Sequence, residues 1–314
     1  MQKSYISALY ELIKQDDRVI SCLSDSGTDY DELVAREFPN QVINFGISEN
    51  NKLAAAAGLA ATGKIPFVYT TSAFIAYRSY EFLRDDICLQ NRNVKLVGMG
   101  TGLCWSTLGP THHTTEDLAI LKSLPNLTII TPASPKELVK AVNEAYKIKG
   151  PVYIRMGMSN EEEIYNEDYN FEFGKNVEIT NGDDITLFVT GSIISEVLDA
   201  TKMLEEKNIK TKVINVHTIK PIDEENIIKE LKNKEKVFSI EEHNIIGGLG
   251  SSIADIIAKN KLNTELIKIG LNDKFGIGFG THKEVLEINK LDSKSIFDKI
   301  YKNLFIKKHE LNNQ

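Results

Sequence analysis

The 314-residue chain is long enough for about two domains of ~150 residues, each with its own hydrophobic core. Acidic residues outnumber basic ones by 44 to 37, for a formal net charge of -7, which argues against a nucleic-acid-binding surface. No apolar run reaches the roughly 18 residues of a membrane-spanning helix, so we expect neither a nucleic acid nor a membrane as a partner.

Helical and β-branched segments alternate along the first half of the chain. Helices are predicted at Ser4–Gln15, Glu49–Thr62, Ala76–Gln90 and Ser134–Lys147. Strands are predicted at Arg18–Leu23, Val42–Phe45, Phe67–Tyr69, Val94–Gly98, Leu127–Thr131 and Val152–Arg155, with a polar turn around Asp25–Asp29. Strands separated by helices of this length predict βαβ units and a mainly parallel sheet.

An acidic, Asn- and Tyr-rich segment between Ser159 and Asp184 shows little periodicity and predicts a linker. After it, strands are predicted at Ile185–Thr190, Thr211–Val216, Val237–Glu241 and Leu266–Gly270. The helices expected between and after them are Ile194–Lys207, Glu224–Lys232, Ser251–Lys259 and Ser293–Leu304, and the polar tail from Lys307 to Gln314 is expected to fray. We therefore predict an α/β protein with domains at 1–160 and 183–314, joined by a linker at 161–182.

The three cysteines are Cys22, Cys88 and Cys104, and none belongs to a C-x-x-C pair. This pattern predicts neither a disulfide framework nor a structural zinc site. The amino-terminal segment also lacks the apolar stretch of a signal peptide. Together these features favour a reducing, cytoplasmic location.

Several residue types with catalytic potential stand out. Glu49 opens an apolar helix, where an acid is most simply explained by the helix dipole. Phe74, Tyr77 and Tyr80 follow at a helical spacing that more often marks a core. Two adjacent histidines, His112 and His113, follow a Gly-Pro turn in a polar loop, which packing explains less readily.

Taken together, these segments resemble the carboxy-terminal half of transketolases over nearly the whole chain. The matching motifs of the first domain are Gly46-Ile47-Ser48-Glu49, the aromatic run Thr71–Tyr80 and the loop Gly109-Pro110-Thr111-His112. Those of the second are His217–Asp223 and Glu241–Ser251. The resemblance implies a pyrimidine-binding domain followed by a transketolase C-terminal domain.

The resemblance implies thiamine diphosphate as the cofactor, with Mg²⁺ holding its diphosphate. Glu49 would then be the buried acid that hydrogen-bonds the pyrimidine nitrogen and helps to activate the thiazolium carbon. Such a glutamate must hold a proton, and burial without a nearby cation raises its pKa in that direction. Phe74 corresponds to the aromatic residue that stacks on the pyrimidine, and Tyr77 and Tyr80 would complete the apolar pocket.

The resemblance also implies substrate-binding residues. His112 corresponds to the histidine that contacts the ketose hydroxyls, and His113 is an extra imidazole beside it. Arg155 corresponds to an arginine that holds the sugar phosphate. The alternative for Arg155 is a surface arginine at a strand end with a carboxylate partner.

The sequence departs from the family pattern at Leu108. The family has an aspartate immediately before the Gly-Pro/Ala-Thr-His loop, where it contacts a sugar hydroxyl. Leucine cannot accept that hydrogen bond, and an unpaired buried hydroxyl costs about 1–3 kcal/mol. Leu108 therefore predicts a donor or acceptor sugar different from the usual pentose phosphates.

The family's magnesium motif, Gly-Asp-Gly followed by a distant Asn, is missing. The nearest match, Gly182-Asp183-Asp184 with Asn208, lacks the second glycine and is interpreted as a charged turn. We therefore predict that a separate subunit supplies the diphosphate and magnesium site, and the resemblance implies an α2β2 assembly. The chain would be active only with that partner.

The predicted function is that of the C-terminal subunit of a split transketolase-like enzyme. It would transfer a two-carbon ketol unit between sugar or sugar phosphate substrates. One alternative is half of a deoxyxylulose-phosphate-synthase-like enzyme or the beta subunit of a 2-oxoacid dehydrogenase. A non-catalytic scaffold or regulatory subunit is another, although it would have no physical need for Glu49, Phe74 and the histidine pair together.

Overall fold

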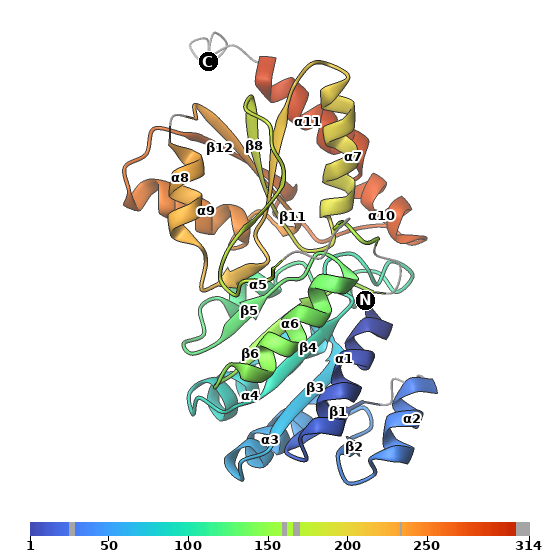
Figure 1. Cartoon of the computed structure of the whole chain (residues 1–314). Coiled ribbons are helices and arrows are strands. Elements are labelled where there is room, and N and C mark those ends of the chain that lie inside the picture. The colour runs from blue at the N-terminus through green and yellow to red at the C-terminus, as the bar shows by residue number, and fades with distance from the viewer. Residues whose placement is uncertain (25–28, 159–161, 166–169, 233, 306–314) are drawn as a thin grey trace.

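The amino-terminal half of the chain surrounds a seven-stranded sheet in the computed structural model (Figure 1). The structure describes residues 1–24, 29–158, 162–165, 170–232 and 234–305. The strands, in spatial order, are β10 (Thr218–Lys220), β5 (Thr128–Ile130), β6 (Val152–Met156), β4 (Lys95–Met99), β3 (Ile65–Thr71), β1 (Val19–Leu23) and β2 (Val42–Asn44). All neighbours are parallel except β10 and β5.

Helices cover both faces of this sheet. Phe67 and Tyr69 of β3 point into one core with α1 (Gln2–Gln15) and α6 (Pro135–Lys147), whereas Val68 joins the opposite core with α3 (Glu49–Ala61). Strands buried on both faces read as continuous apolar runs, which is why β1, β4 and β6 were recognisable from the sequence. The remaining helices of this half are α2 (Asp29–Glu37) and α5 (Asp117–Leu121).

The second half forms a five-stranded sheet. Its strands, in order, are β12 (Glu265–Leu271), β11 (Lys236–Asn244), β8 (Ile185–Thr190), β9 (Thr211–Asn215) and the antiparallel β7 (Val177–Thr180). Its helices are α7 (Ile194–Glu205), α8 (Glu224–Leu231), α9 (Leu249–Lys259), α10 (His282–Asn289) and α11 (Ser293–Phe305). The predicted class, two mainly parallel sheets flanked by helices, is confirmed. None of the described helices is both long and apolar enough to cross a bilayer.

The two halves share hydrogen bonds as well as a surface. Strand β10 belongs to the second half of the chain yet pairs with β5, with Thr218 opposite Ile130. The backbone N–H of Thr131 also donates to the carbonyl of His217 at 2.7 Å. One apolar cluster joins Ile129 and Tyr153 of the first half to Ile219 of the second. The second half thus completes the first sheet.

Several expected elements differ from the observed ones or lie outside the described residues. The helix expected over Ala76–Gln90 begins earlier and is broken into π-helical turns, η1 (Phe74–Arg78) and η2 (Leu83–Cys88), around the short α4 (Tyr80–Phe82). Strand β7 lies within the predicted linker 161–182, because a four-residue edge strand offers too little alternation to be recognised. The expected turn at Asp25–Asp29 lies mostly, and the tail Lys307–Gln314 entirely, outside the described residues.

Candidate active site

Glu49 lies where a buried helix begins at the edge of the first sheet. Gly46 turns the chain after β2 with a φ of 62°, and Asn44 fixes the turn by accepting the Gly46 N–H at 2.8 Å. Ser48 is the helix N-cap, but its hydroxyl donates to the Phe45 carbonyl rather than capping the helix. The Glu49 side chain is 3% exposed. A buried carboxylate at this point needs a specific partner.

That partner is Arg78. Its Nη1 lies 2.7 Å from Oε2 of Glu49, and its guanidinium carbon lies 4.0 Å from the centroid of the Phe74 ring. The expectation that Glu49 is buried without a cation is therefore corrected. The π-helical turn Phe74–Arg78 places both side chains on one side of the helix, so the guanidinium contacts the Phe74 ring and the Glu49 carboxyl group together.

The predicted pocket residues divide into two groups. His112 contacts Phe74, with ring centroids 5.4 Å apart, so a chain of contacts through Arg78 and Phe74 links Glu49 to His112. Tyr77 instead exchanges hydrogen bonds with Glu116, and the Tyr80 hydroxyl approaches the Ile120 carbonyl at 3.4 Å. The two tyrosines line a separate hollow of about 490 Å³ against Ala119 and Ser123. Their hydroxyls therefore face α5.

The two histidines of the loop also face different surroundings. The Gly109 carbonyl accepts the backbone N–H groups of both His112 and His113, which folds the loop into a tight turn. His113 is buried, and burial lowers the pKa of its imidazole, opposed by the nearby Glu242 carboxylate.

Leu108 is 45% exposed. The Phe279 ring lies so close to Gly109 that a Cβ there would fall 2.5 Å from it.

Arg155 occupies the interior rather than the site. Its Nε donates to both carboxylate oxygens of Asp117, at 2.9 and 3.2 Å, and both side chains are nearly inaccessible. Its Nη2 donates to the carbonyls of Thr114 and Glu242. The geometry favours the alternative of an arginine with a carboxylate partner, in a buried position between the two halves. The predicted phosphate contact lacks support from these distances.

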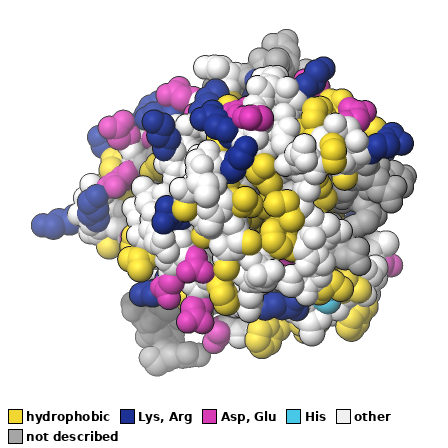
Figure 2. Space-filling view, turned by 90° about the horizontal axis from the view of Figure 1, so that it is seen from below, with side chains coloured by type: hydrophobic (Ala, Val, Ile, Leu, Met, Phe, Trp, Pro, Cys, Tyr) yellow, Lys and Arg dark blue, Asp and Glu magenta, His cyan; other side chains and the backbone are white. Residues whose placement is uncertain are grey.

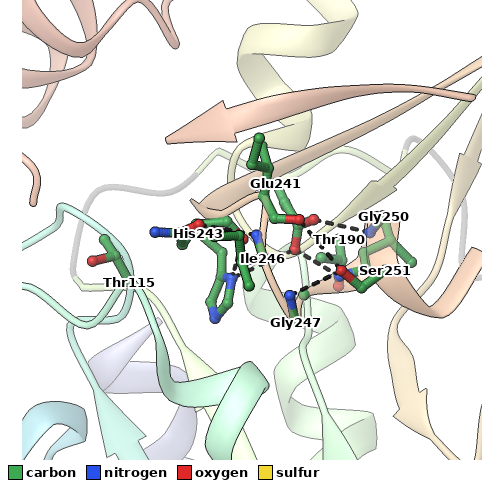
Figure 3. Close-up of polar contacts among 12 residues, drawn as sticks. Thr115, Thr190, Glu241, His243, Ile246, Gly247, Gly250 and Ser251 are labelled. Atoms are coloured by element: carbon green, nitrogen blue, oxygen red, sulfur yellow. Dashed lines mark hydrogen bonds and ion pairs between the residues drawn. The ribbon is translucent and has the colours of Figure 1, made fainter. Parts of the chain in front are cut away.

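Side chains of the same protein bind backbone N–H groups of the glycine-rich segment at the start of α9 (Figure 3). The Glu241 carboxylate accepts the backbone N–H groups of Leu249 and Gly250 at 2.7 and 2.9 Å. Ser251 accepts the N–H of Gly247 at 2.8 Å. A Cβ at Gly248 would lie 1.9 Å from Glu241, so the segment needs glycine there. The amides that could bind an anion at this helix start are already occupied.

The near match to the magnesium motif has a structural role. Gly182 to Asp184 form a bend before β8, where Asp184 accepts the backbone N–H of Lys210 at 2.7 Å. A Cβ at Gly182 would lie 2.4 Å from the Thr211 nitrogen. These contacts agree with the charged turn expected from the sequence.

Sequence reasoning missed Arg78 and Trp105. Arg78 follows Phe74 by four residues, a spacing that places side chains on one helix face and could have pointed to it. Trp105 lies with its ring centroid 6.2 Å from that of His112, and no local pattern signals this contact.

Two family models match the chain in sequence. The transketolase pyrimidine-binding domain matches residues 1–162, and the transketolase C-terminal domain matches residues 174–296. The chain is 38% identical over 96% of its length to a protein described as a transketolase C-terminal section from Methanocaldococcus jannaschii, of which it covers 95%. It is 36% identical over 84% of its length to one subunit of the apulose-4-phosphate transketolase of Actinobacillus succinogenes, covering 85% of that protein.

Other relatives extend the comparison. A 1-deoxy-D-xylulose-5-phosphate synthase of Chlorobium luteolum is 33% identical over 95% of the chain, which spans 48% of that longer protein. Among solved structures, a split-gene transketolase described as an inactive beta4 tetramer is 32% identical, with a TM-score of 0.86 and 98% of both chains covered.

Proposed function

Because the chain belongs to the transketolase family, we propose that it is the C-terminal subunit of a split, thiamine-diphosphate-dependent transketolase. Its reaction would transfer a two-carbon ketol unit between sugar or sugar phosphate substrates. The observation that carries the proposal is the chain of contacts that links Glu49, Phe74 and His112. The protein that contains it aligns over 84% of its length with a separately encoded subunit and over 98% with a split-gene transketolase chain.

The residues around Phe74 fit an aminopyrimidine ring. The Arg78 guanidinium, which is planar and rich in N–H donors, already lies over Phe74 and donates to Glu49. An aminopyrimidine is also planar and would present nitrogen atoms to the same carboxyl group. Arg78 has room to leave, because 46% of its side chain is exposed.

Each side chain would then have a defined task. When bound, thiamine diphosphate supplies the carbon nucleophile that cleaves and forms the carbon–carbon bond. Once Arg78 has moved away, Glu49 would hold a proton between its carboxyl group and a pyrimidine nitrogen. Phe74 offers an apolar face to the ring. His112 is placed to bind substrate hydroxyls beside the reacting carbon.

We further propose that a partner subunit supplies the diphosphate and Mg²⁺ site, in an α2β2 assembly in the cytoplasm. None of the three cysteines, all of which lie in the described part of the chain, forms a disulfide, which suits a reducing compartment. Ile47, two residues before Glu49, is 78% exposed, and Phe275 and Phe279 are 72% and 68% exposed. Figure 2 shows one end of the molecule, where further apolar side chains gather between charged ones. Large exposed apolar side chains of this kind support a protein interface.

Co-expression with a subunit that carries Gly-Asp-Gly…Asn tests the assignment. The pair should convert a ketose and an aldose phosphate into the ketol-transfer products, whereas neither chain should do so alone. The isolated chain should bind thiamine diphosphate weakly in calorimetry with Mg²⁺ present. Submicromolar binding by this chain alone would overturn the split site. Formation of 1-deoxy-D-xylulose 5-phosphate by the pair would favour the synthase alternative, which the relative of that name supports.

Leu108 is proposed to set the sugar specificity of the assembled enzyme. It is 45% exposed on the histidine loop and offers only methyl groups to a substrate. Leu108→Asp should shift kcat/KM toward xylulose 5-phosphate and ribose 5-phosphate, because a carboxylate can accept the hydroxyl that leucine leaves unpaired. Equal efficiency of the wild-type pair and a housekeeping transketolase on these sugars would refute this role.

A further inference from the structure

A second group of reactive side chains lies in the cleft between the two domains. Cys104 comes from the loop after β4, Glu242 from β11, and His282 from the first position of α10. Their candidate ligand atoms all lie within 4.8 Å of one another. The cleft has a volume of about 980 Å³ and is lined by Cys104 and His282 but by none of Glu49, Phe74 and His112.

The distances are those of three ligands facing one point. Sγ of Cys104 lies 3.8 Å from Nε2 of His282, and Oε1 of Glu242 lies 2.8 Å from the same nitrogen. In a proton relay, the sulfur and the carboxylate would contact opposite ring nitrogens. Here both face Nε2, so the imidazole cannot take a proton from the thiol while donating one from its other nitrogen to Glu242.

The spacing is close to that of a tetrahedral metal site. Zinc–ligand bonds of about 2.0–2.3 Å place neighbouring ligand atoms roughly 3.3–3.8 Å apart. The sulfur–nitrogen distance already satisfies this, and the nitrogen–oxygen pair would open by about 0.5 Å. Glu242 is held in place because Oε1 also accepts the backbone N–H of Leu103. The carboxylate is therefore preset on the side of the cysteine loop.

The surroundings favour a cation. Among the described residues that line the cleft are four carboxylates, Glu162, Glu196, Asp199 and Glu284, against a single lysine, Lys283. Without a metal, Nε2 of His282 lies in hydrogen-bond contact with Oε1 of Glu242, and a metal ion would bind that nitrogen in place of a proton.

We propose that Cys104, Glu242 and His282 bind one Zn²⁺ or a similar divalent transition metal ion, with an open coordination position toward the cleft. A thiolate, an imidazole and a carboxylate suit zinc, whereas Mg²⁺ prefers oxygen ligands alone, so this site is chemically distinct from a cofactor-linked magnesium site. The ion would join the two domains, since Cys104 belongs to the first half and the other two ligands to the second. The sequence predicted no zinc site because Cys104 and His282 are 178 residues apart.

Cobalt titration of the chelator-treated chain tests the proposal directly. One Co²⁺ per chain should bind, with a near-ultraviolet thiolate-to-cobalt absorption band that one equivalent of Zn²⁺ removes. Cys104→Ser should abolish the band, and Cys104→Ser and His282→Gln should each weaken Zn²⁺ binding at least about tenfold. Cys88→Ser is the matched control, because Cys88 is also buried but lies outside the cluster, and it should keep the band.

A second measurement needs no variant. Zn²⁺ should slow alkylation of Cys104 by iodoacetamide, read by mass spectrometry, and should leave the rate at Cys88 unchanged. Zinc affinity weaker than about 100 µM in the wild type, or an unchanged band in folded Cys104→Ser, would overturn the site. Both readouts are independent of transketolase activity, so failure here leaves the proposed function untouched.

Discussion

Glu49 and Glu241 are two glutamates beside the first turn of a helix, but different groups bind their carboxylates. Glu241 accepts two backbone N–H groups of α9, which cannot move away without unfolding the helix. Glu49 is paired with one half-exposed side chain, Arg78. Position and burial are similar in the two cases. What separates a structural carboxylate from an available one is whether its partner can leave.

The largest expected effect that follows from this comparison is on turnover. Glu49→Gln in the assembled enzyme should lower kcat by about 10²–10⁴-fold, because an amide can hydrogen-bond the pyrimidine but cannot exchange a proton. Proton–deuterium exchange at the thiazolium carbon measures the step directly. Glu81→Gln, at an exposed position of α4, is the control. If Glu49→Gln exchanges this proton at the wild-type rate, Glu49 only complements the dipole of its helix.

The corresponding change at Glu241 should affect stability rather than turnover. Glu241→Gln replaces one carboxylate oxygen by an NH₂ group that faces a backbone N–H, so one buried donor loses its partner. The free energy of unfolding should fall by about 1–3 kcal/mol in urea titrations, with turnover per folded molecule preserved. The exposed Glu206→Gln should change it far less. An equal loss of unfolding free energy in Glu241→Gln and Glu206→Gln would contradict the structural role of the Glu241 carboxylate.

Arg78→Met sharpens the idea of a displaceable partner. If the guanidinium must leave Glu49 and Phe74 before the cofactor binds, its removal should tighten thiamine diphosphate binding by the assembled enzyme about 2–10-fold. Calorimetry on the complex measures the change, and Arg84→Met, on the exposed side of η2, is the control. Weaker binding would instead mean that Arg78 itself holds the cofactor.

The smallest expected effect is a pH dependence near Glu49. Burial lowers the pKa of Lys52, one turn after Glu49, to about 8, with Glu49 and Cys22 opposing the shift. Between about pH 8 and 10.5 the unfolded chain binds more protons at this residue than the folded one, so stability should rise with pH. The slope should stay below about 1.4 kcal/mol per pH unit. Lys52→Met should flatten it, whereas the exposed Lys14→Met should not.

Much of the fold could be predicted because its strands are buried on both faces. The range Ile185–Thr190 was predicted to the residue, since a short, continuous apolar run between polar turns is typical of a strand buried on both faces. Helix α10 was missed although Thr281 and Glu284 form a capping box, because the apolar pattern behind it is weak. Local patterns suffice where burial is uniform along an element.

The site could be predicted only in part, for a related reason. Glu49, Phe74 and His112 follow turns that the sequence shows, and contacts through Arg78 link them in the structure, while their catalytic roles stay predictions. The partners of Arg155 and the convergence of Cys104 with Glu242 and His282 depend on contacts between the two halves of the chain. No spacing along the chain encodes such contacts, so only the folded structure reveals them.

Strand β10 has a consequence for anyone who wishes to divide the molecule. Cutting the chain in the region between residues 160 and 176 would leave β5 at the edge of the first sheet with unpaired backbone groups, ready to pair with another chain. The first half alone would therefore tend to aggregate, although it contains helices on both faces of the sheet and one apolar cluster of its own. The two halves are therefore best expressed and engineered as a single chain.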